Sequence, residues 1–193
     1  MTLLTKEFYL HDDVIALSQQ LLGKYLFTAT PEGIAGGIII ETEGYRGPED
    51  VASHAYNLRR TPRNEVLYSP GGVAYVYICY GIHYLLNVVT NGKDIPHAIL
   101  LRAILPTDGI ELMVKRRGKK ILDRTTANGP GNLSQALGVT RSFNGEELTG
   151  SRIWIEDRGI IPKKEEIIAS PRIGIDYAEE YALMPWRFQL KLC

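Results

Sequence analysis

The chain has 193 residues, of which 45% are hydrophobic and 23% are charged, and its 22 basic and 22 acidic side chains give a formal net charge of zero. This length and composition indicate one domain that can bury a substantial core without disulfide or metal staples. No run is apolar for long enough to span a membrane, and the charge balance excludes the overall basic footprint that many nucleic-acid-binding proteins show.

The N-terminus and the cysteines indicate a protein of the reducing cytoplasm. Residues 1–13 contain no basic region followed by an apolar stretch and a cleavage site, so we expect no secretion signal. Cys79 and Cys193 form neither a C-x-x-C pair nor a ligand cluster with the four scattered histidines. A zinc or iron–sulfur site is therefore not expected, and two unpaired thiols fit a cytoplasmic location.

The spacing of apolar residues predicts elements along the whole chain, without internal repeats. The first helix is capped by Asp12 or Asp13 and ends at Gly23, and a later helix is capped by Asp108. Strands cluster in the middle, which favours an α+β fold with a mainly antiparallel sheet. In chain order we predict a helix at 11–23, strands at 24–30 and 34–43, a polar loop at 44–70 with helical turns at 50–56 and 63–68, two strands joined by a tight turn within 71–92, a strand at 97–106, helices at 108–118 and 129–139, and strands at 152–157, 165–175 and 185–192.

Two carboxylates end a strand that is otherwise apolar. Ile38–Ile40 lead into Glu41 and Glu43, whose side chains have the same parity and therefore point to one face. An ionised group out of water is strongly disfavoured unless it is paired. One interpretation is a solvated strand end neutralised by arginines. The other is a general base on a rigid strand, able to hold and deprotonate a water molecule.

Arg102 is the only charged residue in the apolar run HAILLRAIL. Its five hydrogen-bond donors need acceptors, so it is not expected to be free. It either forms a structural ion pair at a sheet edge or faces one of the two carboxylates and helps to hold a water molecule.

The tyrosines form the next unusual pattern, with 11 Tyr against four Phe and two Trp. A Tyr-rich hairpin is often simply sheet, because aromatic residues favour strands. Tyr77 and Tyr80 have opposite parity, however, so one can face inward while the other lies in the turn beside Gly81. A pocket of flat rings built from Tyr45 and Tyr77 would suit a flat aromatic ligand, and would suit a cationic one better.

Other polar residues carry weaker signals. Asn87 interrupts the apolar LLNVV and is either at an edge, bonded to the backbone, or in a pocket wall. His54 stands alone, and a solvated or core position is its default. The basic runs 57–64 and 115–124 are typical of solvated faces, although either could contact a phosphate backbone.

Taken together, several blocks resemble the alkyladenine, or 3-methyladenine, DNA glycosylase family. The resemblance implies one domain over residues 1–193, with a curved, mainly antiparallel sheet, surrounding helices and a projecting β-hairpin. It implies a monofunctional DNA glycosylase that flips an alkylated or deaminated purine out of duplex DNA and hydrolyses its N-glycosidic bond, which starts base excision repair. The blocks follow the family's order over nearly the whole chain and read ETEGYRGPEDVASHAY, RTPRNEVLY, GVAYVYICYGIHYLLNVVT, AILLRAILP, NGPGNLSQALGV and PRIGID with PWRF.

The resemblance also assigns roles by position. Glu43 resembles the general base that activates water, Arg102 the residue that helps to position that water, and Ile173 would add a backbone carbonyl to it. Tyr80 resembles the wedge that fills the vacated base stack. The remaining candidates are the base-pocket residues Tyr45, His54, Tyr77 and Asn87, with Asn87 crowding the 2-amino group of guanine, and the DNA-side residues Arg63 and Asn64.

The expected partner is double-stranded DNA with a damaged purine, bound by a monomer without a metal or other cofactor, in the cytoplasm at the nucleoid. Asn132 stands where many relatives carry Lys, so we expect one DNA-facing charge fewer, and the chain ends earlier than some relatives. The sequence does not rank 3-methyladenine, 7-methylguanine, hypoxanthine and ethenoadenine.

Two alternatives stay open. A lesion-binding protein without catalysis would not need Glu43 and Arg102, and a small-molecule nucleoside hydrolase would not need the wedge Tyr80.

Overall fold

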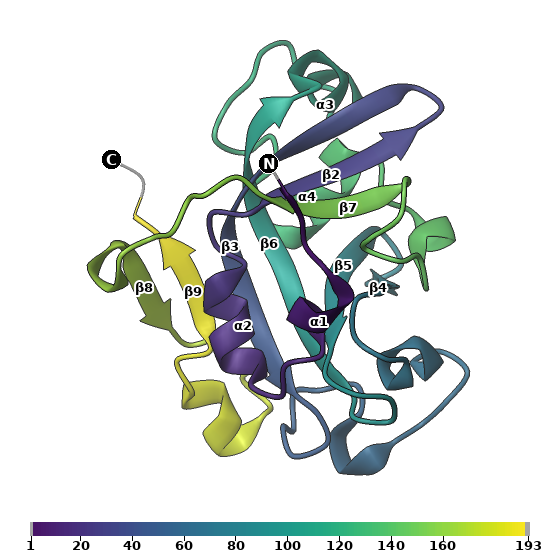
Figure 1. The fold of residues 1–193 in the computed structure, drawn as a ribbon, viewed down its shortest axis with the longest axis vertical. Helices are drawn as coiled ribbons and strands as arrows, with labels where there is room; N and C mark the ends of the chain where they lie inside the picture. Colours follow the sequence, from purple (N-terminus) through teal and green to yellow (C-terminus); the bar gives the residue numbers. More distant parts are fainter. Residues whose placement is uncertain (1, 192–193) are drawn as a thin grey trace.

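The computed structural model describes residues 2–191, and every strand in that range joins one antiparallel sheet (Figure 1). The order is β1-β7-β2-β3-β6-β5-β4, with β9 pairing to β3 and β8 to β9. The strands are β1 (Thr2–Leu3), β2 (Tyr25–Thr30), β3 (Gly33–Arg46), β4 (Ala74–Cys79), β5 (His83–Thr90), β6 (His97–Asp108), β7 (Ile153–Asp157), β8 (Ile167–Ser170) and β9 (Arg187–Leu190). The helices are α1 (Lys6–Tyr9), α2 (Val14–Gln20), α3 (Ile110–Arg116) and α4 (Pro130–Leu137), and single 3-10 turns lie at Tyr56–Leu58, Glu65–Tyr68, Arg141–Phe143, Lys164–Glu166 and Glu179–Leu183.

The two longest strands, β3 with 14 residues and β6 with 12, form the centre of the sheet. The first part of β3 pairs with β2, and residues 41–43 pair with β9 on the same edge. Strand β3 therefore passes from one neighbour to another at the carboxylates, and its end extends beyond β2. This confirms the predicted α+β fold with a mainly antiparallel sheet.

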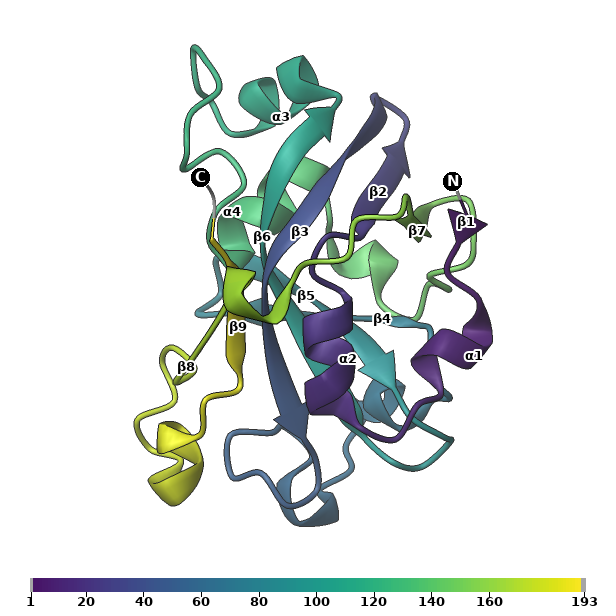
Figure 2. The same cartoon turned by 60° about the vertical axis from the view of Figure 1, so that its left-hand side comes forward.

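Helix α2 determines which face of β3 is closed. Asp13 caps it as predicted, because its Oδ1 accepts hydrogen bonds from the backbone N–H groups of residues 15 and 16, both at 3.0 Å. Thr42 donates to the carbonyl oxygen of Ser18 at 2.7 Å, and a Cβ on Gly44 would lie 2.8 Å from a methyl group of Ile15. Helix α2 thus lies against β3 (Figure 2), on the face of Thr42 and Gly44, so the side chain of Glu43 between them points to the opposite face.

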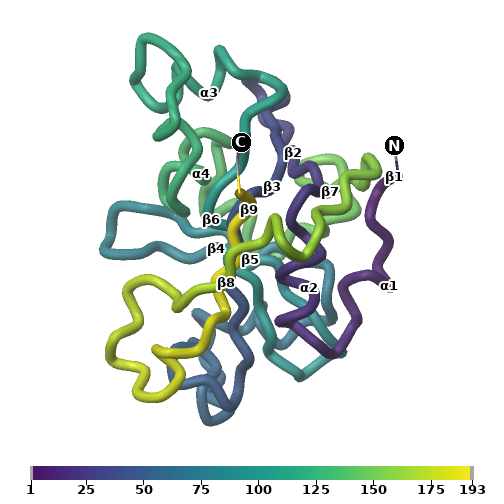
Figure 3. The backbone as a smooth tube through the Cα atoms, turned by 90° about the vertical axis from the view of Figure 1, so that its left-hand side faces the viewer, coloured from purple at the N-terminus to yellow at the C-terminus, as the bar shows by residue number. Residues whose placement is uncertain are grey.

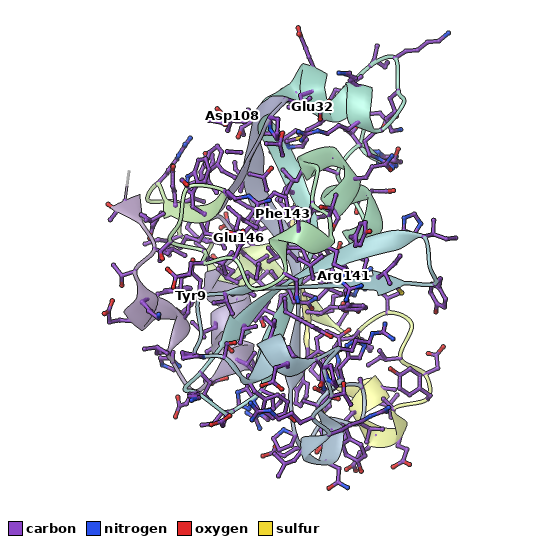
Figure 4. All side chains as sticks on the ribbon, turned by 90° about the vertical axis from the view of Figure 1, so that its right-hand side faces the viewer. Tyr9, Glu32, Asp108, Arg141, Phe143 and Glu146 are labelled. Carbon is purple, nitrogen blue, oxygen red and sulfur yellow. The ribbon has the colours of Figure 1, made fainter. Side chains whose placement is uncertain are left out.

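The hydrophobic core lies between the sheet and the helices α2 and α4, and Tyr9 is among its largest members (Figure 4). A buried cluster of Leu, Ile and Val from β2, β3, β5, β6 and β7 fills this layer. Burial of apolar surface stabilises the folded state by about 25 cal/mol per Å². The well-packed core therefore supports the strands whose ends carry the polar residues.

The β4–β5 hairpin extends away from the rest of the chain as an arm (Figure 3). Cys79 pairs with His83, which leaves Tyr80, Gly81 and Ile82 as the loop. Tyr80 and Gly81 have φ values of 50° and 71°, in the left-handed region that glycine tolerates and tyrosine rarely adopts. The predicted strand–turn–strand is confirmed, with its most exposed aromatic at the tip.

Several local predictions differ from the structure. The cap of α3 is Gly109, with φ 64°, rather than Asp108, whose Oδ2 instead accepts a hydrogen bond from the hydroxyl of Thr107 at 2.7 Å. Residues 51–55 form turns and a bend rather than helix, and the strand predicted at 165–175 is limited to β8. Leu192 and Cys193 lie outside the described residues. Within residues 2–191, no helix is long and apolar enough to cross a membrane.

Candidate active site

The register of the sheet brings residues from its central strands to one face. Glu43 pairs with Leu100, Leu100 with Asn87, and Asn87 with Tyr75, across β3, β6, β5 and β4. Directly opposed residues of antiparallel strands share a face. Glu43, Asn87 and Tyr75 therefore line the face opposite α2, although they are far apart in sequence.

Glu43 is fully buried, with an exposed fraction of 0%, and three donors surround its carboxylate. Its Oε1 accepts a hydrogen bond from the backbone N–H of Ile173 at 2.9 Å and lies 3.2 Å from a terminal nitrogen of Arg102. Its Oε2 accepts from the hydroxyl of Tyr45 at 2.8 Å. A carboxylate has about four acceptor positions, so one stays open for a further partner such as water.

Arg102 contacts both carboxylates, which lie on one face of β3 as strand parity predicted. Its Nε donates to Oε1 of Glu41 at 2.9 Å while its terminal nitrogen contacts Glu43. Strand β9 adds Arg187, which donates to the same oxygen of Glu41 at 3.1 Å. Two acids and two arginines therefore form a balanced cluster, which is the condition under which charges can stay buried. Glu41 acts as a structural member of this cluster.

A cavity beside Glu43 contains all of the predicted base-pocket residues. It measures about 30 Å³ and is lined by Tyr45, Ala52, Ser53, His54, Leu67, Tyr75, Tyr77, Asn87 and Ala98. The His54 and Tyr77 rings lie 4.5 Å apart at 67°, and Nδ1 of His54 lies 2.9 Å from the hydroxyl of Tyr75. This volume is about that of one water molecule in the liquid.

The pKa values of titratable groups in the pocket walls are shifted in the direction that favours their neutral forms. Burial raises the pKa of Tyr45 well above its ordinary value, and the negative charge of Glu43 raises it further. Burial also raises the pKa of Tyr75 to about 12. Although part of His54 is exposed, burial lowers its pKa, and the positive charges of Arg63 and Arg59 add to this. The walls are therefore uncharged aromatic surfaces next to a carboxylate.

Asn87 is fixed in the pocket wall. Its side-chain amide is buried and donates to the carbonyl oxygen of Tyr75 at 3.2 Å. This bond, between strands that already pair, holds the amide in a single orientation. The structure thus shows the backbone bond expected as one alternative, and it places Asn87 in a pocket wall rather than at a sheet edge.

A wider cavity of about 320 Å³ adjoins the pocket. The exposed side chain of Arg63 borders it and donates to the carbonyl oxygen of Ile78 in the hairpin at 3.2 Å. Asn64 is buried instead, and its amide donates to the carbonyl oxygens of His54 and Arg59 at 2.9 and 2.7 Å. Asn64 therefore orders the loop that carries His54, whereas Arg63 is placed to meet a ligand.

Tyr80, the predicted wedge, has an exposed fraction of 90% and lies outside both cavities. Ile82, beside it in the loop, is 73% exposed. Apolar side chains at a projecting tip expose a surface that another molecule can cover.

Three of the six basic side chains in the run 115–124 form ion pairs with neighbouring carboxylates. Arg116 pairs with Glu32 at 2.9 Å, and Lys119 pairs with Asp123 at 2.7 Å. This supports the interpretation of a solvated face. Among residues 2–191 no group of three or more potential metal ligands was found, and Cys79 is a free thiol.

Sequence reasoning missed one buried ion pair at the site. Arg172 forms a bidentate pair with Asp50, and both side chains are fully buried. The signal was present, because Asp50 belongs to the acidic block after β3 and Arg172 to the block PRIGID. Nothing in either block predicts that the two would meet. Tyr75 was likewise predicted only as a strand residue, although it lines both cavities.

Comparison with known proteins gives a consistent result. A family model described as methylpurine-DNA glycosylase (MPG) matches residues 7–192. A protein of Chlamydia pneumoniae named "Putative 3-methyladenine DNA glycosylase" is 50% identical over 189 residues, covering 97% of this chain and 95% of the relative. Proteins with the same name from Chlamydia felis and Bacillus licheniformis are 48% and 47% identical, covering 98% and 96% of this chain and 97% and 91% of the relatives.

Proposed function

This chain belongs to the methylpurine-DNA glycosylase family, and from this membership we propose that residues 1–193 form one monofunctional glycosylase domain that hydrolyses the N-glycosidic bond of a flipped, damaged purine. The protein is a DNA glycosylase of the 3-methyladenine type and acts in base excision repair of DNA. The single observation that supports the proposed hydrolysis is the carboxylate of Glu43, which is fully buried, contacted by three donors and next to an aromatic pocket.

The chemistry follows from the placement of that carboxylate. Glycosidic cleavage develops positive charge on the sugar, and a nearby carboxylate both stabilises that charge and takes a proton from the attacking water. Oε2 of Glu43 has an open acceptor position for this water. Arg102 and the backbone carbonyl of Ile173 would help to orient it. Attack by water rather than by an amine gives a free base and an abasic site.

The pocket suits the leaving group. Alkylation at a ring nitrogen makes a purine cationic, which weakens the glycosidic bond and favours stacking on the electron-rich faces of Tyr45 and Tyr77. Neutral lesions such as hypoxanthine would stack in the same place with His54 lining the pocket. The fixed amide of Asn87 would crowd the 2-amino group of guanine and so exclude the normal base.

The hairpin is the element that would open the duplex. A base must leave the stack before it can be hydrolysed, and damaged pairs open at a lower free-energy cost. Tyr80 at the exposed tip would fill the vacated space, as intercalating side chains do in other minor-groove binders. Arg63 would contact the backbone beside it, and Asn64 would support that loop. One lesion requires one copy, so a monomer acting at the nucleoid is sufficient.

The direct test is base release from duplex oligonucleotides that carry ethenoadenine, hypoxanthine or 7-methylguanine, measured in EDTA. Release of the free base with an intact abasic strand is the expected result. Tight binding to a lesion without release would instead favour a lesion-binding protein. Release from free nucleosides as fast as from duplex DNA would favour a nucleoside hydrolase.

A further inference from the structure

The buried guanidinium of Arg172 connects segments that are far apart in the sequence. It forms a bidentate pair with Asp50, which lies in the loop between β3 and His54. It also donates to the carbonyl oxygen of Gly44 in β3 at 3.0 Å and to that of Tyr181 at 3.2 Å. One planar group therefore holds the end of β3, the pocket loop and the C-terminal segment together.

The same guanidinium lies behind the pocket. Its central carbon is 4.5 Å from the centroid of the Tyr45 ring and 5.1 Å from that of Trp186. Because the hydroxyl of Tyr45 donates to Glu43, the tilt of this ring determines where that donor lies. The other uncharged donor to Glu43 is the N–H of Ile173, the residue that follows Arg172.

We propose that Arg172, held by Asp50, is a positioning residue for the reaction, and this inference rests on the glycosylase function proposed above. It fixes the Tyr45 ring from the side away from the base and aligns both uncharged donors on the Glu43 carboxylate. A guanidinium can stack and bind bidentately at once, which an ammonium cannot. Misplacement of a reacting group by about 1 Å can lower a rate about 100-fold.

Substitution of an arginine that only stabilises the fold should leave the rate of base release unchanged. Arg116 provides the matched control for this comparison. Its side chain is nearly buried, and it binds Glu32, the carbonyl oxygen of Ala136 at 3.1 Å and the hydroxyl of Thr30 at 2.6 Å. Glu32 lies beside α3, at the end of the molecule opposite the pocket loop (Figure 4). Both arginines hold the fold, but only Arg172 touches the machinery around Glu43.

The experiment compares Arg172→Met, Arg172→Lys and Arg116→Met with wild type. Two quantities are measured on folded protein: the single-turnover rate constant for ethenoadenine release from duplex DNA, and the Kd for a duplex with a non-cleavable abasic analogue. We expect Arg172→Met to lower the rate constant about 100-fold and Arg172→Lys about tenfold, with each Kd within about threefold of wild type. Arg116→Met should keep the wild-type rate constant.

Three results would overturn the proposal: a wild-type rate constant in a folded Arg172 variant, a loss of rate matched by an equal loss of binding, or the same loss of rate in Arg116→Met. If Arg172→Met does not fold, the Lys variant decides by the same criteria. Absence of release by wild type is a separate outcome, because it refutes the proposed function before any variant is examined.

Discussion

The end of β3 and the tip of the β4–β5 hairpin depart from ordinary burial in opposite directions. At the end of β3, Glu41, Glu43 and Arg102 lie inside the protein although charges are rarely fully buried. At the hairpin tip, Tyr80 and Ile82 lie in solvent although their side chains are largely apolar. The buried charges at the end of β3 are compensated within the protein by hydrogen-bond donors and opposite charges. The exposed side chains at the hairpin tip are not covered by any other part of the described residues.

This difference separates two kinds of functional residue. A buried charge that the fold fully supports can be kept in one orientation for chemistry. An exposed aromatic at a tip gains from burial only when another molecule arrives, so its contribution belongs to binding. Substitutions at the two places should therefore have separable effects on stability, catalysis and binding.

The largest effect on stability is expected from Arg102→Met. The change leaves two buried carboxylates with one arginine fewer, and breaking a buried ion pair typically costs ~3–5 kcal/mol. Urea denaturation should show this loss, and base release should fall with it. As a control, Arg60→Met removes exposed pairs with Glu65 and Asp94 and should cost far less, because exposed ion pairs contribute little to stability. Equal losses in both variants would contradict the distinction between them.

Tyr80→Ala should leave stability unchanged within ~0.5 kcal/mol, because the side chain contacts solvent. Its effect should appear only on duplex DNA, where filling the vacated stack offsets an unstacking cost of a few kcal/mol. We expect release from a duplex lesion to slow by about tenfold or more, and release from the same lesion in single-stranded DNA to stay the same. Equal slowing on both substrates would exclude a wedge.

A smaller effect concerns the pH dependence of stability through His54. Burial and nearby arginines lower the pKa of this residue in the folded state, so the unfolded chain binds the proton first. The resulting loss of stability is absent well above pH 6.5 and grows as the pH falls below that unfolded-state value. His54→Gln should make the free energy of unfolding fall less steeply between pH 7 and pH 5. His97, whose pKa is also lowered, is common to both proteins, so their difference isolates His54.

The smallest effect is expected from Asn132→Lys at the start of α4. The ring of His83 packs over neighbouring Gly131, so this helix end lies beside the hairpin. A lysine there should make the slope of log association constant against log salt concentration more negative by about 1, which corresponds to one added phosphate contact. An unchanged slope would show that Asn132 faces away from DNA.

The features of the site that could be predicted from the residues were those indicated by local sequence patterns. Strand parity placed Glu41 and Glu43 on one face, and the apolar surroundings of Arg102 indicated that it must meet an acceptor. Both signals depend only on neighbouring residues and on the general cost of burying a charge. The roles within the pocket came from family resemblance, because residue patterns alone left each of them with a structural alternative.

What the sequence did not predict depends on distant contacts. Arg172 and Asp50 are 122 positions apart, and no local pattern specifies such a pair. Residues 50–55 have helical spacing, but a short segment gains little from helix formation. There Oδ1 of Asp50 accepts the N–H of Ala52 at 3.0 Å, and its carboxylate is bound by Arg172, so the tertiary contact favours a turn.

The most direct test of the central claim compares wild type with Glu43→Gln and Glu41→Gln on one ethenoadenine duplex. The two acids lie on one face and share Arg102, but only Glu43 borders the pocket rings, through Tyr45. We predict that Glu43→Gln lowers the single-turnover rate constant by about 10³-fold with little change in Kd, within the range typical of a lost general base. Glu41→Gln should lose stability and keep most of the rate. A Glu43→Gln enzyme that releases base within about tenfold of wild type would contradict the assignment of Glu43 as the base.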